Sequence, residues 1–247
     1  MAKISGLTVT SPHDEHEHAH HPKLQHHFDT MEQQRDASSF GMWVFLVTEI
    51  MFFGGMFCAY LIYRNWYYDA FVAASNTLSL PLGTINTAVL ICSSLTMAMA
   101  VLASQLGQRK LLVFFLLATM GLGAIFLGIK GVEYKAKFDE HHVPGAGFST
   151  EDFVEHPPAG VKPLRPDMAQ RTQIYFSLYF AMTGMHAVHM IIGMVIMAFL
   201  VVWAWRGEYT PAHHTMIENF GLYWHFVDIV WIYLFPLLYL ISRNPHH

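Results

Sequence analysis

Glu49 is the residue whose position most needs a chemical explanation. It lies in the stretch WVFLVTEIMFFGGMFCAYLIY, Trp43 to Tyr63, which is otherwise apolar and long enough to cross a bilayer. An ionisable group inside a membrane costs about 2.5–3.5 kcal/mol on insertion scales, so it is by default a functional group with a partner. Packing alone explains a carboxylate on this span poorly. Glu49 is therefore the first candidate functional residue.

Five other polar side chains fall at or near apolar stretches, and two pairs of them have helical spacing: Glu133, His186, His189, His225 and Asp228. His186 and His189 are three residues apart, as are His225 and Asp228, so each pair lies on one helix face. The aspartate could hydrogen-bond to His225 and fix the tautomer of its ring. Alternatively, these groups only tie helices together through hydrogen bonds that contribute about 0.6 kcal/mol each.

The motifs of a redox metal site are missing from this sequence. A haem or copper centre needs several converging histidines, closely spaced cysteines with His and Met, or a C-x-x-C-H motif. The two cysteines, Cys58 and Cys92, fall in separate apolar stretches, and we expect them to be buried small hydrophobic residues. The run HDEHEHAHHPKLQHH near the N-terminus could bind metal, but only loosely.

The composition places these residues in a membrane protein. Hydrophobic residues make up 53% of the chain and charged residues 13%, which indicates an integral membrane protein and not a globular enzyme. The net charge is −4 and the 14 Lys and Arg are scattered, which argues against nucleic acid. We expect an all-α bundle of five transmembrane helices, at about 40–63, 82–106, 111–129, 174–205 and 220–241. An odd number of spans puts the termini on opposite sides of the membrane.

Two polar regions flank or interrupt the spans. Residues 1–38 form a His-rich tail that we expect to be disordered, because it cannot bury enough apolar surface. Residues 39–247 form one five-helix domain, in which VPGAG, HPPAG and KPLRP mark residues 138–173 as an extramembrane loop. The basic residues around the spans are split almost evenly between the two faces. The positive-inside rule therefore gives no orientation.

Four ordered motifs resemble subunit III of the haem–copper oxidases, from about Ser38 to Arg243. They are WVFLVTEIMFF, GIKGVEYKAKF, TGMHAVHMIIG and HHTMIENFGLYWHFVDIVWIYLFPLLYL. The last motif departs from the family pattern at two positions: this chain has Ile217 where the family has Phe, and Leu222 where the family has Trp. The better-known members have seven spans, whose first two form one arm of a V-shaped lipid cleft. This chain resembles the five-span bacterial form, so another subunit must supply the missing arm.

The resemblance implies roles for particular residues. Glu49 matches the family's carbodiimide-reactive carboxylate, which is linked to proton supply and to sustained turnover. A carboxylic acid in low dielectric favours its neutral form, so it can stay in the bilayer and still exchange protons with polar neighbours. Arg206 falls near the family's lipid-headgroup arginine. The recurrent polar positions of the family match Glu133, His186, His189, Glu218, His225 and Asp228.

The resemblance also implies the setting of the chain. Such a subunit binds no haem or copper itself and packs against catalytic subunit I, which with subunit II belongs to the respiratory chain of aerobic electron transport. Phospholipids, further small subunits and a respiratory supercomplex are the other implied partners. The implied location is the bacterial inner membrane, with the N-terminus cytoplasmic and the C-terminus periplasmic.

Several functional alternatives remain open. The preferred function is a non-redox accessory subunit of a cytochrome c oxidase that supports proton uptake and stability. A quinol oxidase subunit III and a nitric oxide reductase accessory protein share the family's spans. A proton-coupled transporter would explain the intramembrane acids, but such proteins usually show two-fold repeats and broken spans. Neither feature is visible in the sequence.

Overall fold

The protein is all-helical across the described residues. The computed structural model describes residues 28, 30–145, 147–155, 157–158, 161–207, 209 and 214–241. Within them the helices are α1 (Met31–Trp66), α2 (Tyr68–Asn76), α3 (Leu80–Gln105), α4 (Arg109–Asp139), α5 (Glu151–Val154), α6 (Pro166–Ala169), α7 (Thr172–Arg206) and α8 (Thr215–Tyr239). Five segments are long and apolar enough to cross a membrane, namely α1, α3, α4, Pro166–Arg206 and α8. The predicted all-α bundle of five spans is confirmed.

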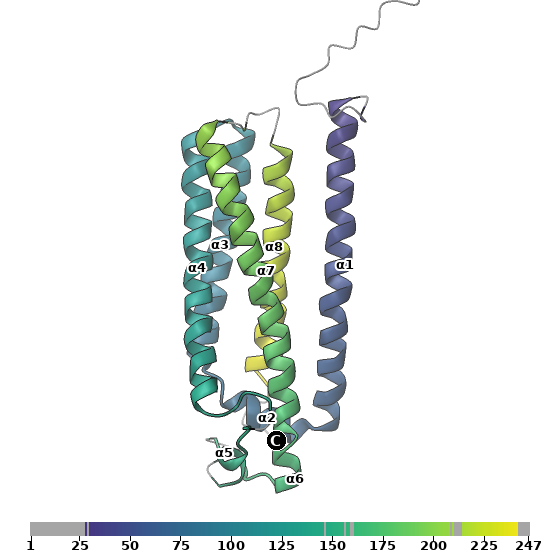
Figure 1. Ribbon diagram of the computed structural model, residues 1–247, viewed down its shortest axis with the longest axis vertical. Coiled ribbons are helices and arrows are strands. Elements are labelled where there is room, and N and C mark those ends of the chain that lie inside the picture. Colours follow the sequence, from purple (N-terminus) through teal and green to yellow (C-terminus); the bar gives the residue numbers. More distant parts are fainter. Residues whose placement is uncertain are drawn as a thin grey trace, which may run out of the picture.

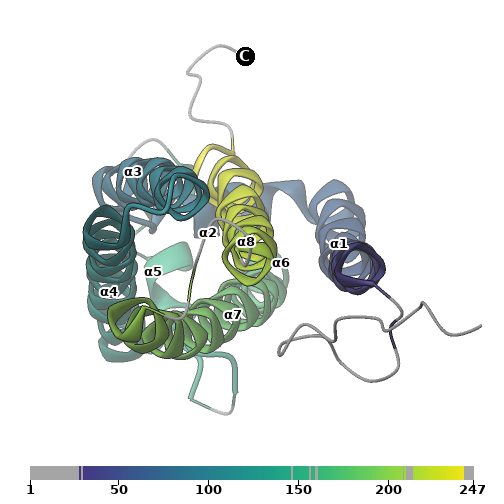
Figure 2. The ribbon, with the colours of Figure 1, turned by 90° about the horizontal axis from the view of Figure 1, so that it is seen from above.

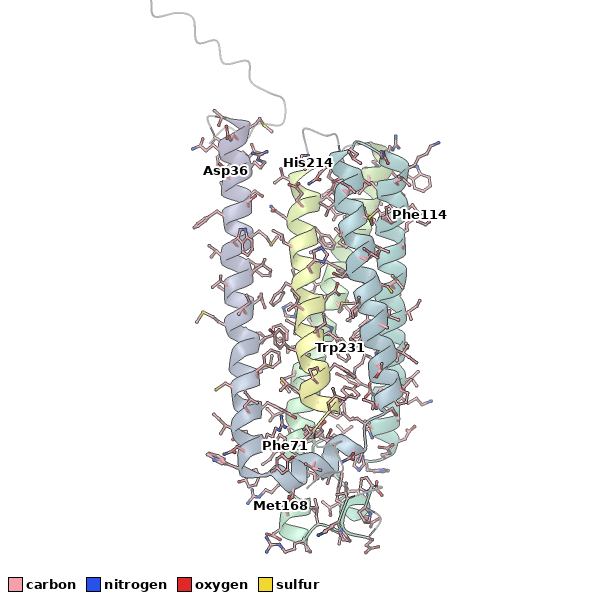
Figure 3. All side chains as sticks on the ribbon, turned by 180° about the vertical axis from the view of Figure 1, so that it is seen from behind. Asp36, Phe71, Phe114, Met168, His214 and Trp231 are labelled. Carbon is pink, nitrogen blue, oxygen red and sulfur yellow. The ribbon has the colours of Figure 1, made fainter. Side chains whose placement is uncertain are left out.

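The five long helices are arranged as four plus one. Seen from above, α3, α4, α7 and α8 surround a common core, and α1 stands outside it beside α8 (Figure 2). The described chain enters at one end of the bundle and α8 runs toward the other (Figure 1). Figure 3 places Asp36 near the entry end of α1 and Phe71, on α2, near the opposite end. Helix α2 therefore crosses beneath the bundle and connects α1 to α3.

Local sequence sets the ends of the helices. The Thr30 side chain accepts a hydrogen bond from the Gln33 amide at 3.1 Å and so caps the start of α1. Helix α7 ends at Gly207, whose φ of 83° is a left-handed conformation that favours glycine. Helix α1 begins at Met31, within the polar segment 1–38. The His-rich run lies outside the described residues.

Two tryptophans of α8, Trp224 and Trp231, are buried in the core of the four-helix group. Trp224 of α8 is fully buried and donates through Nε1 to Ser93 Oγ at 3.0 Å. A Cβ atom added to Gly193 of α7 would lie 2.9 Å from its ring, and one added to Gly123 of α4 would lie 3.3 Å away. Because glycine lacks a side chain, α4 and α7 can both approach the indole closely.

Two sequence-based expectations about buried residues need correction. Cys58 and Cys92 are exposed on the outer surface of the chain, on faces of α1 and α3 that point away from the core. Helix α4 continues past Ile129 to Asp139, so Lys130 and Lys137 are not flanking surface charges. Their side chains are only 5% and 4% exposed. Apolar length alone gave too early an end for this helix.

The close approach of α7 to Trp224 can be tested by substitution. We expect Gly193→Ala to destabilise the protein by about 1–3 kcal/mol, because the added methyl group overlaps a rigid ring. Gly184→Ala on the same helix is the control, since its Cβ would meet only Tyr134 Oη at 3.9 Å. Thermal unfolding of the detergent-solubilised protein measures both. Equal midpoints for the two variants would contradict this account of the packing.

Candidate functional site

The structure pairs Glu49 of α1 with His189 of α7. Glu49 Oε2 lies 3.0 Å from His189 Nε2, and the two side chains are 19% and 13% exposed. His189 Nδ1 lies 2.8 Å from the carbonyl oxygen of Met185, one helical turn earlier. Phe53 packs beside the imidazole with ring centroids 5.3 Å apart. The carboxylate that appeared unpartnered in the sequence therefore has a partner 140 residues away.

The hydrogen bond between Glu49 and His189 can form in two ways. The Met185 carbonyl can only accept, so His189 Nδ1 carries a hydrogen and donates it. If the imidazole is neutral, Nε2 accepts from a protonated Glu49; if it is charged, Nε2 donates to a carboxylate. Both forms hold the same number of protons and have no net charge. A proton can therefore move between the two groups without changing the charge buried in the bilayer.

The pair lies in the wall of a groove between α1, α7 and α8. The groove has a volume of about 1350 Å³, and Ile192, Ile196 and Phe220 give it an apolar lining. Its outer end is polar, with Arg35 of α1 among the lining residues. Ser38 there accepts a hydrogen bond from Asn219 Nδ2 at 2.9 Å. The groove thus combines an apolar length with one polar end, which holds the cation Arg35 and the carboxylate Glu32.

The remaining histidines do not join this pair. His225 Nδ1 lies 2.7 Å from Ser94 Oγ on α3, in place of the hydrogen bond to Asp228 that the spacing suggested. Neither oxygen of Asp228 makes a hydrogen bond of good geometry among the described residues, although the Ser94 hydroxyl lies near its carboxyl group. The ring of His186 packs against Phe126 and Trp231, with centroids 5.4 Å from each. The i,i+3 spacing correctly predicted a shared face but not the bond.

Glu133 belongs to a separate buried cluster around Lys130. Lys130 Nζ donates to Glu133 Oε2 at 2.9 Å and to the hydroxyls of Tyr179 and Tyr239, both at 3.1 Å. Tyr239 in turn donates to Glu133 Oε1 at 2.5 Å. The cluster ties α4 to α7 and α8. Sequence reasoning missed Lys130, although its three-residue spacing from Glu133 is an ion-pair signal on a helix.

The last two sequence-predicted site residues lie toward the other end of the bundle. Glu218 accepts from Gln105 Nε2 at 2.6 Å and lies 3.2 Å from His214 Nε2. Arg206 is exposed in the last turn of α7 and is not among the residues that line the groove. Arg35, which the sequence did not single out, is the groove's lining cation. Among the described residues, no group of three His, Cys, Asp or Glu side chains could hold a metal ion.

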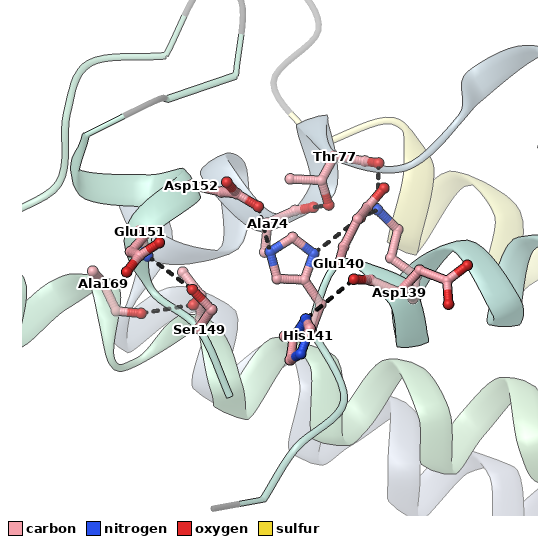
Figure 4. A network of polar contacts seen from close by, with 12 residues as sticks. Ala74, Thr77, Asp139, Glu140, His141, Ser149, Glu151, Asp152 and Ala169 are labelled. Atoms are coloured by element: carbon pink, nitrogen blue, oxygen red, sulfur yellow. Dashed lines mark hydrogen bonds and ion pairs between the residues drawn. The ribbon is translucent and has the colours of Figure 1, made fainter. Parts of the chain in front are cut away.

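Outside the membrane spans, His142 anchors the loop after α4. Its side chain is 1% exposed and stacks on Phe176 of α7, with centroids 5.0 Å apart and an interplanar angle of 12°. Nδ1 donates to Glu140 Oε2 at 3.1 Å (Figure 4). Nε2 lies 3.3 Å from Asp152 Oδ2, an ion-pair distance without hydrogen-bond geometry. The ring therefore joins the end of α4 to α5 and α7.

Burial dominates the electrostatics of this anchor. It lowers the pKa of His142 below its ordinary value of 6.5, and the positive charge of Lys137 lowers it further. Glu140 and Asp152 oppose this shift without reversing it. Lys137 Nζ donates to Glu140 Oε2 at 2.5 Å and to the Thr77 carbonyl at 2.8 Å, which links α4 to the end of α2.

The fold and its contacts define a multi-pass helical membrane protein whose ionisable groups are held between helices. Within that class the sequence matches one family. Residues 24–148 and 167–243 match cytochrome c oxidase subunit III, and the chain belongs to this family. It is therefore an accessory subunit of a haem–copper oxidase of the respiratory chain, and the resemblance of the sequence motifs is confirmed.

Curated relatives match over most of their own length. The cytochrome c oxidase subunit 3 of Thermostichus vulcanus is 30% identical over 217 residues, which cover 87% of this chain and 92% of the relative. The cytochrome bo(3) ubiquinol oxidase subunit 3 of Pseudomonas aeruginosa is 28% identical, with 89% and 92% covered. A probable quinol oxidase subunit 3 of Staphylococcus aureus is 25% identical, with 87% and 94% covered.

The lowered pKa of His142 predicts a pH-dependent loop. The folded loop binds this proton less readily than the unfolded loop, so the ordering of the loop is complete above pH 6.5. It is lost progressively as the pH falls from 6.5 toward the lowered pKa. Hydrogen exchange at the Ser149 and Leu164 amides, corrected for the intrinsic rate, measures this ordering.

His142→Phe is the matched control for this prediction, because it keeps an aromatic ring against Phe176 and removes the titrating group. In this variant the corrected exchange rates at Ser149 and Leu164 should be the same at pH 7 and pH 5, because no histidine titrates at this position. The same pH dependence in the variant and the parent would contradict the role given to His142.

Proposed function

We propose that the Glu49–His189 pair supports proton uptake by the catalytic subunit of the oxidase. The observation that carries this proposal is the hydrogen bond of 3.0 Å between an acid and an imidazole within the spans. Such a pair stays neutral overall if it releases one proton as it takes up another. Its partial exposure in a groove gives it contact with the surroundings of the chain.

The implied partners and location follow from the family. We infer direct contact with subunit I and association with subunit II and small subunits, in a bacterial inner membrane with the N-terminus cytoplasmic. Helix α1 supports this, because many of its large apolar side chains, including Phe40, Ile50 and Met51, are exposed in the isolated chain. We therefore expect a reporter that works only outside the cytoplasm to be active when it is fused after Ile241.

Cytochrome c is the electron donor that we propose. The family description and the Thermostichus relative both carry this donor in their names, whereas the Pseudomonas and Staphylococcus relatives are named for quinol. Purification through a tag on this chain should recover a haem protein with a reduced-minus-oxidised spectrum. Oxygen consumption with cytochrome c and no activity with quinol would support the assignment; the reverse pattern would overturn it.

We further propose that the groove holds a phospholipid. Its apolar walls match acyl chains, and Arg35 at the polar end matches a phosphate. Arg206, in the last turn of α7, is a second proposed contact for the headgroup, at the same end of the bundle.

The role of Glu49 is tested by chemical labelling and a near-isosteric change. A hydrophobic carbodiimide attacks carboxyl groups in apolar surroundings, so it should label Glu49. Glu49→Gln keeps the hydrogen bond to His189 but holds no transferable proton. We expect this variant to assemble normally while turnover at high pH, or the number of turnovers before inactivation, falls severalfold.

Glu218→Gln is the control carboxylate, because Glu218 lies in the first turn of α8 and is hydrogen-bonded to Gln105. It should leave carbodiimide labelling unchanged. Glu49→Ala should add a packing defect and lose bound lipid or subunit. If Glu49→Gln matches the parent in proton pumping, pH dependence and lifetime, the pair serves only to hold α1 in place.

The lipid proposal predicts a loss on substitution of the cations at the groove. Arg35→Gln should reduce the phospholipid that copurifies with the complex severalfold, because a charge-assisted contact to the phosphate is removed. Arg206→Gln tests the second contact in the same way, and Arg165→Gln, on an exposed loop side chain, is the control. Native mass spectrometry measures the bound lipid. Unchanged lipid in both Arg35→Gln and Arg206→Gln would argue against this headgroup site.

A further inference from the structure

Three polar side chains in the core of the four-helix group lack partners. Asn86 of α3, His186 of α7 and Asp228 of α8 are 0%, 1% and 2% exposed. Both amide atoms of Asn86 and both ring nitrogens of His186 have no hydrogen-bond partner among the described residues. The Ser94 hydroxyl lies near the carboxyl group of Asp228, but it is 2.7 Å from His225 Nδ1 and makes no hydrogen bond of good geometry to either oxygen of Asp228. More than nine in ten buried polar groups in proteins are paired, so three such side chains in one core need an explanation.

These side chains converge around Trp231 of α8. Its Nε1 donates to Oγ1 of Thr87, the residue that follows Asn86, at 3.1 Å. The ring of His186 lies 5.4 Å from that of Trp231 between centroids. Asp228 is three residues before Trp231 and so shares its helix face, one turn away. Three helices therefore bring unpaired polar atoms to the same depth of the bundle.

The chemistry of the set identifies its ligand class. Asn86 offers two donors and an acceptor, a neutral His186 offers one of each, and Asp228 offers mainly acceptors. A cation would need a shell of oxygen ligands, and an anion would need donors only. Water donates twice and accepts twice, so it satisfies a mixed set whatever the protonation state of Asp228. Buried waters typically make about three hydrogen bonds to groups of this kind.

We propose that the core of α3, α7 and α8 binds ordered water between Asn86, His186 and Asp228. This site is separate from the Glu49–His189 pair, which lies at the groove and contacts α1, although His186 and His189 are less than one turn apart on α7. It extends a polar column through the bundle. On one side is the Ser94–His225 contact, and on the other is Lys130, whose Nζ lies 5.1 Å from the centroid of the Trp231 ring.

The first test is direct. A density map of the purified complex, at a resolution that shows ordered water, should contain density within about 2.7–3.2 Å of polar atoms from at least two of the three side chains. Direct hydrogen bonds among the three side chains, or no density between them, would overturn the proposal. The map is decisive even if a substituted chain does not assemble.

The second test uses the sign of a stability change. If Asn86 is truly unpaired, Asn86→Leu removes a buried polar group without a partner and raises the unfolding temperature. If it binds water, the change strands the water's other partners and lowers that temperature by about 2–6 °C. Met97→Leu, at a fully buried apolar position on the same helix, is the control for repacking. Asn86→Ser should recover part of the loss, because its hydroxyl can still bind water. An unfolding temperature at or above that of Met97→Leu contradicts the site.

Discussion

The structure depends on one constraint: inside a bilayer, a polar atom must find its partner within the protein. The helices satisfy their own backbones, so the constraint falls on the side chains. Lys130 meets it fully, with Glu133, Tyr179 and Tyr239 around one ammonium group. Tyr60 and Tyr175 meet it by donating to the carbonyls of Leu237 and Leu238, close to where α8 ends. Polar residues thus fix which faces of these helices can meet.

The same constraint explains how α1 is attached. The four-helix group has a shared core, but α1 touches only one side of it, and the contacts are spaced along its length. Ser38 contacts Asn219, Glu49 contacts His189 and Tyr60 contacts Leu237. Between them the apolar surfaces are less tightly closed, which leaves the groove. The carboxylate that is proposed to handle protons therefore also helps to hold the outlying helix.

The sequence predicted the parts of the structure that depend on local composition. All five spans were predictable because apolar length is a property of one segment. The partner of Glu49 was not, since His189 is 140 residues away and only the packing of α1 on α7 joins them. The predicted hydrogen bond between His225 and Asp228 was wrong, because His225 contacts Ser94 on a different helix instead. Lys130 was missed because a helix can bury a charge beyond the end of its apolar stretch. The family motifs identified the polar positions but could not show how they group.

The long separation between Glu49 and His189 has a consequence for biosynthesis. Helix α1 is made before α7, so the acid enters the membrane before its imidazole exists. At about 5–20 residues per second, 140 intervening residues take roughly 7–28 s to translate. During that interval Glu49 has no partner on its own chain and must remain protonated or be shielded by the insertion machinery. The order of synthesis thus favours a carboxylic acid at this position, because it can be neutral until α7 is inserted. An arginine would stay charged.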